Sequence, residues 1–310
     1  MGLSILLAEQ IVALFLMGLV GYVAVKSGKF RTEDSKIISN VVVYICSPFV
    51  VIDAFQIAFT AEKLQGLLLA FAASVLVHGL MIIGGRLLGK PLGLNGIEKA
   101  SVVYSNSGYL IIPLVSAVLG QEWVFYTTAF IVVQTVLIWT HGQAVICGKG
   151  KADMKQMLWN PNVIAIGIGL LLFALQIRLP APVASCISAF GDAIGPISMM
   201  VIGMLVADVD LRGVFCQKRP YLICFLRLVA FPVITVFIFV FTGMSGMHKE
   251  AEYILLIVLL ATSAPAAVMV TQLAQIYEQD AKYASVINVM SVLFSIVTMP
   301  LITLLYEKLV

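Results

Sequence analysis

Small polar residues interrupt two apolar stretches of the chain, and a proline accompanies each interruption. Glycine and proline weaken the hydrogen-bond ladder of a helix, so backbone N–H and C=O groups become free there. The positive N-terminal end of a half-helix, together with open N–H groups, favours an anion, and Asn and Ser side chains add neutral hydrogen bonds. The alternative is a simple proline kink in which Ser and Thr bond to their own backbone. The residues concerned are Asn106, Ser107, Gly108 and Pro113 in the first stretch and Ser263 and Pro265 in the second.

Two charged residues also lie deep inside apolar stretches, and ionisable groups in such positions are functional candidates. Asp192 and Arg227 could pair with each other as a structural ion pair or gate. Alternatively, Arg227 attracts an anionic substrate while Asp192 takes a proton or Na⁺ for coupling. His78 and His141 lie in other apolar stretches, where a histidine either carries protons or fills a polar packing contact.

The composition requires a lipid environment for these residues. Of the 310 residues, 61% are hydrophobic and only 11% are charged, and the mean hydropathy is +1.05. A water-soluble chain needs more polar residues than this to cover its surface. The composition therefore excludes a cytosolic enzyme, a nucleic-acid-binding protein and a disordered chain. The five cysteines form no CxxC pair, so neither a disulfide framework nor a zinc site is expected. We predict no cofactor.

The chain contains ten apolar runs, each about long enough to cross a bilayer as a helix, and the two polar clusters lie within two of them. The runs are apolar throughout, whereas barrel strands alternate over about ten residues, so the prediction is an all-α membrane protein. The predicted spans are residues 5–25, 37–59, 64–88, 100–119, 124–146, 160–177, 183–206, 220–242, 253–274 and 283–306.

Most of the 19 Lys and Arg residues follow odd-numbered spans. Basic loops stay in the cytoplasm, so the loops after odd-numbered spans are predicted to be cytoplasmic. Both termini then lie on the outer side of the cytoplasmic membrane.

Five spans carry the chain from one side of the membrane to the other, so the next five repeat that block upside down. We therefore predict one membrane domain, 1–310, with a first repeat at 1–146, a cytoplasmic linker at 147–158 and an inverted second repeat at 159–310. The polar interruptions fall in the fourth and ninth spans, which are equivalent in the two repeats. Inverted repeats with broken helices are the architecture of many secondary transporters.

In their order and spacing, several motifs resemble the auxin efflux carrier family, which includes plant PIN proteins and small bacterial malonate-type carriers. The resemblance runs over nearly the whole chain. The motifs are Asn106 followed by Pro113-Leu114, Asn160-Pro161-Asn162 with Gly167 and Gly169, Gly191 to Pro196 with Gly203, and Ala264-Pro265-Ala266 with Tyr277, Asp280 and Pro300.

The resemblance implies that helices 4 and 9 cross, that helices 1, 2, 6 and 7 form a scaffold, and that the other six form a transport domain moving like an elevator. The family's carboxylate-binding Asn matches Asn106, and its crossover prolines match Pro113 and Pro265. A polar residue facing the substrate matches Asn162, with Asn160 as the alternative, and Gln134 is a polar position for the same pocket. A homodimer through the scaffold is also implied.

The predicted function is a secondary carrier for a small organic anion, such as a mono- or dicarboxylate, working by alternating access. The sequence contains no GxxxxGK[ST] motif, so energy comes from exchange or from an ion gradient, with H⁺ or Na⁺ as the coupling ion. A symporter of the bile-acid type, or an antiporter, is the first alternative, although span 124–146 lacks the acidic residues typical of such antiporters. A non-transporting membrane receptor is the second, and an intramembrane enzyme has no supporting motif.

Overall fold

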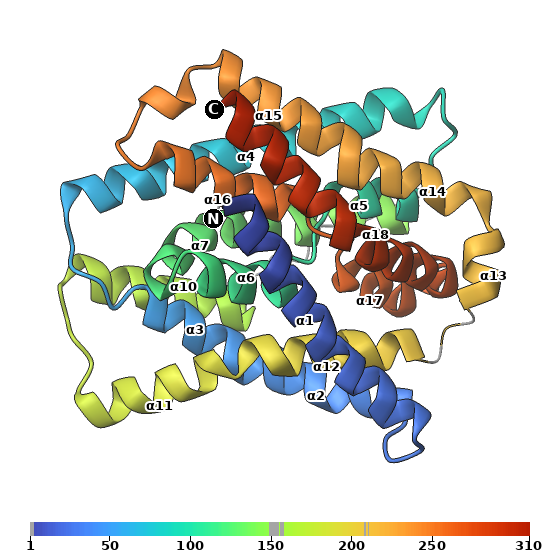
Figure 1. Ribbon diagram of the computed structural model, residues 1–310, viewed down its shortest axis with the longest axis horizontal. Helices are drawn as coiled ribbons and strands as arrows, with labels where there is room; N and C mark the ends of the chain where they lie inside the picture. The colour runs from blue at the N-terminus through green and yellow to red at the C-terminus, as the bar shows by residue number, and fades with distance from the viewer. Residues whose placement is uncertain (1–2, 149–154, 156–157, 208, 210) are drawn as a thin grey trace. The chain divides into compact units, whose positions relative to one another are not determined.

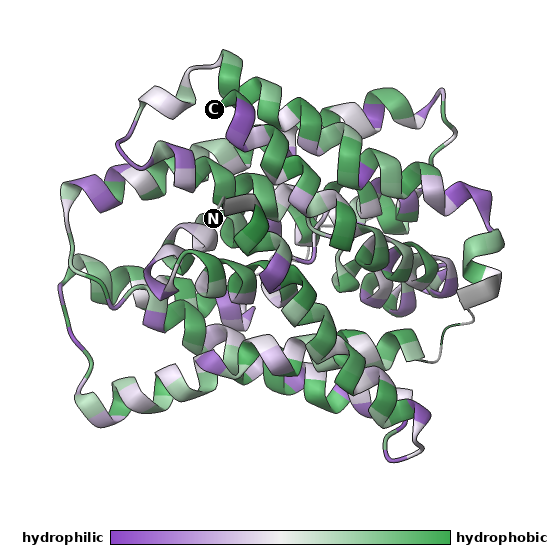
Figure 2. Cartoon of the chain, in the orientation of Figure 1, coloured by the Kyte–Doolittle hydropathy of each residue, from purple (hydrophilic) through white to green (hydrophobic). Residues whose placement is uncertain are grey.

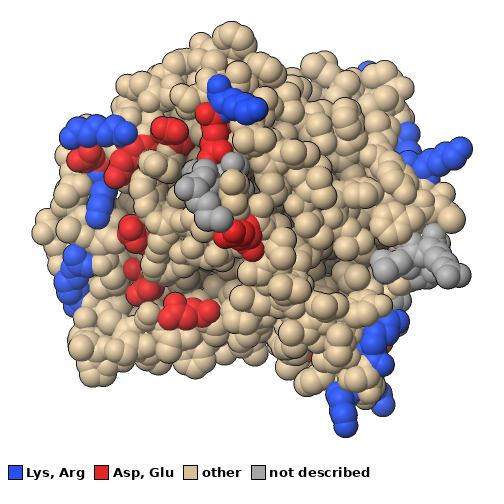
Figure 3. Space-filling view, in the orientation of Figure 1, with Lys and Arg blue, Asp and Glu red and all other residues tan. Residues whose placement is uncertain are grey.

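The computed structural model describes residues 3–148, 155, 158–207, 209 and 211–310. In this part of the chain the secondary structure is helical, apart from turns, loops and one isolated bridge between Ser105 and Ala266. Apolar residues run along the helices (Figure 2), and acidic and basic side chains occupy little of the face seen in Figure 3. Many large apolar side chains are exposed, among them Leu16 and Phe241. This surface is suited to lipid and unsuited to water.

Among the described residues, seven helices are long and apolar enough to cross a membrane. They confirm the prediction of a multi-pass, all-α membrane protein. Each of the seven coincides with one predicted run, and the other three runs contain shorter apolar helices. These shorter helices are Ser107–Val118, Pro161–Ala174 and Ala251–Ser263.

The chain forms two compact units, and each unit takes segments from both halves of the sequence. The predicted repeats at 1–146 and 159–310 stay a prediction, and most of the linker at 147–158 lies outside the described residues. Unit 1 comprises residues 1–64, 108–128 and 158–209, and unit 2 comprises residues 65–107, 129–157 and 210–310.

Unit 1 is built around long helices of the N-terminal and middle parts of the chain (Figure 1). Its helices are α1 (Leu3–Lys26), α2 (Ser35–Val41), α3 (Ser47–Ala54), α6 (Ile112–Val118), α10 (Pro161–Ala174), α11 (Ala181–Asp192) and α12 (Ile194–Ala207). A π-helical turn at Val42–Cys46 joins α2 to α3.

Helices α1 and α12 pack closely because glycines line their contact. A methyl group at Gly203 would overlap the backbone oxygen of Gly18, and one at Gly21 would overlap the backbone of Met200. Small residues of this kind let two helix backbones approach within a membrane.

Unit 2 surrounds the buried helix α16 (Ala251–Ser263), in which every residue from Ile254 to Ser263 is buried. Helix α7 (Val124–Leu137) begins in unit 1 and continues in unit 2. The other helices of unit 2 are α4 (Ala61–Gly89), most of which lies in it, α5 (Gly96–Val103), α8 (Gln143–Cys147), α13 (Leu211–Cys216), α14 (Lys218–Phe225), α15 (Phe231–Phe241), α17 (Val268–Ile276) and α18 (Ala281–Leu309).

Candidate functional site

Two helices of the chain are interrupted at the predicted polar clusters. Helix α5 ends at Val103, Tyr104 is extended (φ −99°, ψ 129°), and helical structure resumes in a π-helical turn at Ser107–Ile111. Helix α16 ends at Ser263, and Ala264 is extended (φ −65°, ψ 155°) before α17 begins. Pro265 accounts for this second break, because proline lacks an N–H and disfavours a helical conformation in the residue before it.

The two breaks lie against each other within unit 2 as short antiparallel segments, residues 104–106 and 264–267, here called the crossing. The backbone N–H of Asn106 donates to the carbonyl of Pro265 over 2.8 Å, and the N–H of Ala267 donates to the carbonyl of Tyr104 over 2.9 Å. These bonds correct part of the expectation from the sequence. The broken backbone is not wholly open to a ligand, because neighbouring backbone already uses some of its amide hydrogens.

Gln134 of α7 binds the first segment of the crossing. Its side-chain oxygen accepts hydrogen bonds from the backbone N–H and the hydroxyl of Ser105, at 2.9 and 2.8 Å. Its amide nitrogen donates to the carbonyl of Ser105 and to the hydroxyl of Ser107, at 2.9 and 3.0 Å. Gln134 therefore lies at the crossing, where it positions the backbone of the break.

Two residues of α18 bind the second segment, and the sequence analysis missed both. The amide of Asn288 donates to the carbonyl of Ala266, and the hydroxyl of Ser291 accepts from the N–H of Ala266 over 3.0 Å. Their spacing of three residues places them on one face of an otherwise apolar helix. That polar pair was the available signal.

Ser263 bonds to the backbone of its own helix, as the kink alternative describes, although the helix is interrupted after it and not merely kinked. Its hydroxyl donates to the carbonyl of Leu260 in its own helix over 3.1 Å, and its side chain is fully buried. Thr262 likewise bonds to Val258. Pro265, by contrast, supplies its carbonyl to the crossing.

Arg227 joins the C-terminal ends of both interrupted half-helices. It lies in the π-helical stretch Leu226–Ala230 between α14 and α15 and is 1% exposed. Its Nε donates to the carbonyl of Ala264 over 3.0 Å, and its Nη1 donates to Val102 and Val103 over 2.9 and 3.2 Å. The last carbonyls of a helix have no partner within the helix and carry partial negative charge, which a guanidinium satisfies.

Two buried donors near these contacts have no hydrogen-bond partner among the described residues. They are Nη2 of Arg227 and the side-chain amide nitrogen of Asn106. Asn106 is 4% exposed, so water does not compensate its amide freely. An unsatisfied buried donor costs about 1–3 kcal/mol. Both groups are donors, so each can bind only a hydrogen-bond acceptor.

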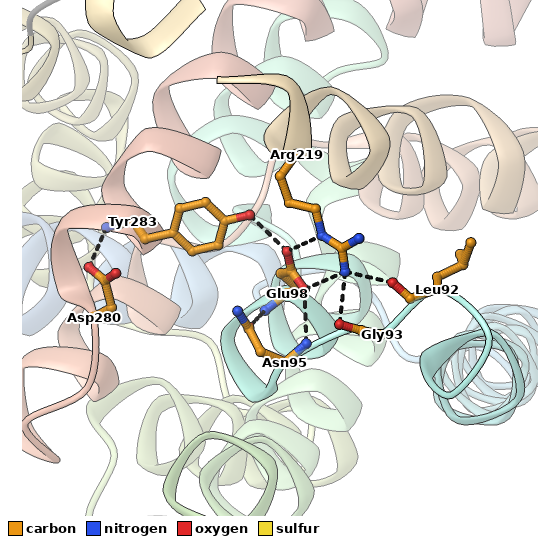
Figure 4. A pocket seen from close by; sticks show the side chains of 7 residues that line it. All are labelled: Leu92, Gly93, Asn95, Glu98, Arg219, Asp280 and Tyr283. Atoms are coloured by element: carbon orange, nitrogen blue, oxygen red, sulfur yellow. Dashed lines mark hydrogen bonds and ion pairs between the residues drawn. The ribbon is translucent and has the colours of Figure 1, made fainter. Parts of the chain in front are cut away.

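The N-terminal end of α5 is fixed by an ion pair between Arg219 and Glu98 (Figure 4). Arg219 donates to the carboxylate of Glu98 over 2.7 Å and to the carbonyls of Leu92 and Gly93, while the hydroxyl of Tyr283 donates to Glu98. Burial raises the pKa of Glu98, but the bonds from Arg219, Asn95 and Tyr283 outweigh it, so the net pKa is lowered. Helix α5 is thus held at both ends by arginines of one helical run, Lys218–Phe241.

The predicted residues Gly108, Pro113, Asn160, Asn162 and Asp192 lie in unit 1. Pro113 lies in the first turn of α6. It cannot donate to the carbonyl of Tyr109, four residues earlier. The hydroxyl of Ser198 supplies that hydrogen bond over 2.9 Å. Gly108 lies in the π-helical turn before α6.

A cavity of about 190 Å³ within unit 1 is lined by Pro113, Asp192, Gln10, Ser116 and Gln121, among others. Asp192 is exposed at the end of α11. Its proposed partner Arg227 belongs to unit 2, so the pairing of the two stays a prediction.

Asn160 and Asn162 have different roles at the start of α10. The side chain of Asn160 caps this helix by accepting from the N–H of Asn162 over 3.0 Å. The side chain of Asn162 is half-buried and accepts a hydrogen bond from Ser47 over 2.7 Å. The structure thus gives Asn160 a capping role, and contact of Asn162 with a substrate stays a prediction.

A family model described as "Membrane transport protein" matches residues 6–157 and 149–303, nearly the whole chain. The chain belongs to this family. The match confirms the resemblance to the auxin efflux carriers. This membrane transport protein is also similar to an uncharacterized transporter of Methanocaldococcus jannaschii, with 23% identity over 288 residues, which cover 88% of this chain and 90% of the relative. A general role in membrane transport follows from the family.

Proposed function

We propose that this transport protein is a secondary carrier for a small organic anion, a mono- or dicarboxylate, which binds at the crossing. The observation that carries the proposal is the pair of buried, unpartnered donors on Arg227 and Asn106. Among the residues whose burial the structure describes, Arg227 is the only buried Lys or Arg. Its hydrogen bonds go to neutral carbonyls, so its positive charge is balanced by no carboxylate in those contacts. A buried, uncompensated charge is costly, and a bound anion would offset that cost.

We further propose that the fold has ten membrane helices in two inverted repeats, with both termini outside the cytoplasmic membrane. In this account the three shorter apolar helices complete the set of ten. A scaffold and a moving transport domain would give alternating access. The division into two units supports this proposal. Unit 1 contains the first, second, sixth and seventh predicted spans, and unit 2 contains the third span and the eighth to tenth.

Coupling and assembly belong to the same proposal. Asp192 lines a cavity and is accessible, so it is a candidate for binding a coupling H⁺ or Na⁺. An Asp192→Asn variant with unaltered pH and Na⁺ dependence of uptake would exclude that role. Assembly as a homodimer through the scaffold helices is proposed from the family resemblance.

The proposal is tested by screening the purified protein against small carboxylates for a rise in its melting temperature, because a ligand that binds the folded form stabilises it by mass action. Asn106→Ala should weaken the apparent affinity for the carboxylate about tenfold, because one buried hydrogen bond to an ion is lost. The rise in melting temperature at a given carboxylate concentration should be smaller as a result. Pro113→Ala should keep binding but slow uptake into proteoliposomes. Asn106→Ala binding and transporting every carboxylate like the wild type would refute the proposal.

A further inference from the structure

A fully buried histidine lies beside the crossing with one ring nitrogen unused. His78 of α4 is 0% exposed, and its ring centroid lies 4.6 Å from that of Phe130, with the two rings tilted by 47°. Its Nδ1 lies 2.8 Å from the carbonyl of Ser74. A carbonyl only accepts hydrogen bonds, so Nδ1 carries a proton. In the neutral ring Nε2 is therefore a bare acceptor, and it has no hydrogen-bond partner among the described residues.

The surroundings of His78 connect it to the anion site. Met81, one helical turn further along α4, contacts Nη1 of Arg227 through its sulfur at 3.5 Å. The ring of His78 lies within interaction range of Arg227 and of Gln134, which holds the crossing. Since Nδ1 already carries a proton, Nε2 is the ring position that is open to a further proton.

We propose that His78 is a proton-binding group of the carrier, in addition to any role of Asp192, and takes a proton at Nε2 when a doubly charged anion occupies the crossing. The inference rests on the proposed anion site. Arg227 supplies a single positive charge, so it balances a monocarboxylate but leaves one negative charge of a dicarboxylate uncompensated. Uncompensated charge inside a membrane protein is expensive. A proton on His78 removes that imbalance.

The charges and the proton balance in this step. The proton comes from water on the side where the anion enters and bonds to the lone pair of Nε2, which gives an imidazolium. The positive charges of the imidazolium and of the Arg227 guanidinium then balance the two negative charges of the anion. When the anion leaves, Nε2 returns the proton to water on the side of release. A dicarboxylate and one proton therefore cross together.

Proton uptake on binding tests this directly. Calorimetric titration of the purified protein at pH 7, in two buffers of different ionisation enthalpy, counts the protons taken up per bound anion. With malonate, the wild type should take up about one proton, and with acetate almost none, because binding and protonation are linked. His78→Gln should bind malonate without proton uptake and about tenfold more weakly.

His248→Gln is the matched control. His248 lies in the connection before α16, outside the apolar helices, and its variant should take up protons as the wild type does. Equal proton uptake by His78→Gln and the wild type, or none by the wild type with malonate bound, would overturn the role of His78 while leaving the anion site intact. If no carboxylate binds the wild type, the proposed function itself fails.

If His78→Gln does not fold, infrared difference spectra of the wild type with ring-labelled histidine give the same test. A new imidazolium band on adding malonate is the expected result. Its absence with malonate bound would overturn the proposal.

Discussion

Replacing Arg227 by Met removes the charge that joins the two broken helices and keeps most of the apolar volume. Three backbone carbonyls, those of Ala264, Val102 and Val103, lose a charged donor at 2.9–3.2 Å. A hydrogen bond to a charged group contributes about 1.5–3 kcal/mol. The guanidinium also pays a desolvation penalty of several kcal/mol, which its removal recovers. We therefore expect Arg227→Met to lower the free energy of unfolding by about 3 kcal/mol, less than the summed bonds suggest.

Arg227→Lys separates charge from geometry. An ammonium keeps the positive charge but lacks the planar fork that reaches carbonyls of two helices at once. We expect it to lose about 1–2 kcal/mol of stability and to retain weakened anion binding. Thermal unfolding in detergent measures both variants against Arg86→Met, which removes an exposed arginine from the same unit. Arg227→Met melting at the temperature of Arg86→Met would refute the idea that this side chain holds the crossing together.

Two further predictions concern packing and pH. Gly203→Leu should destabilise the protein by more than about 2 kcal/mol, because any side chain there meets the backbone of α1. Gly167→Ala, in open space on α10, should leave the melting temperature unchanged. The pKa of Glu98 is lower in the folded protein than its ordinary value, so its stabilisation is complete above that ordinary value and is lost as the pH falls through the folded one. The melting temperature of the wild type should therefore fall more between pH 7 and pH 4 than that of Glu98→Gln, and parallel curves for the two proteins would contradict this assignment.

Local chemistry made part of this structure readable from the sequence. Pro265 ends its helix because proline cannot continue the backbone ladder, and Asn160-Pro161 starts α10 as a cap followed by proline. The long helices were predictable because a helix that crosses a bilayer needs about 20 consecutive apolar residues. These features depend on residues close together in the chain.

The partners of Arg227 could not be predicted in the same way. They are backbone carbonyls 37 to 125 residues away, and a carbonyl leaves no mark in the sequence. The two roles considered for Arg227 therefore omitted its bonds to the half-helix ends. Gln134 was predicted as a polar position. Two of its hydrogen bonds, however, go to the backbone N–H and C=O of Ser105, which the sequence does not reveal. Asn288 and Ser291 did leave a signal, because they form a polar pair three residues apart in an apolar helix.

The central claim is that the unpaired donors of Asn106 and Arg227 receive an anion. The most direct measurement is an experimental structure of the protein with the carboxylate that raises its melting temperature most. We expect a carboxylate oxygen about 3 Å from the side-chain nitrogen of Asn106 and another at similar distance from Nη2 of Arg227. A carboxylate bound elsewhere, with both nitrogens still unpaired or satisfied by the protein itself, would contradict the account.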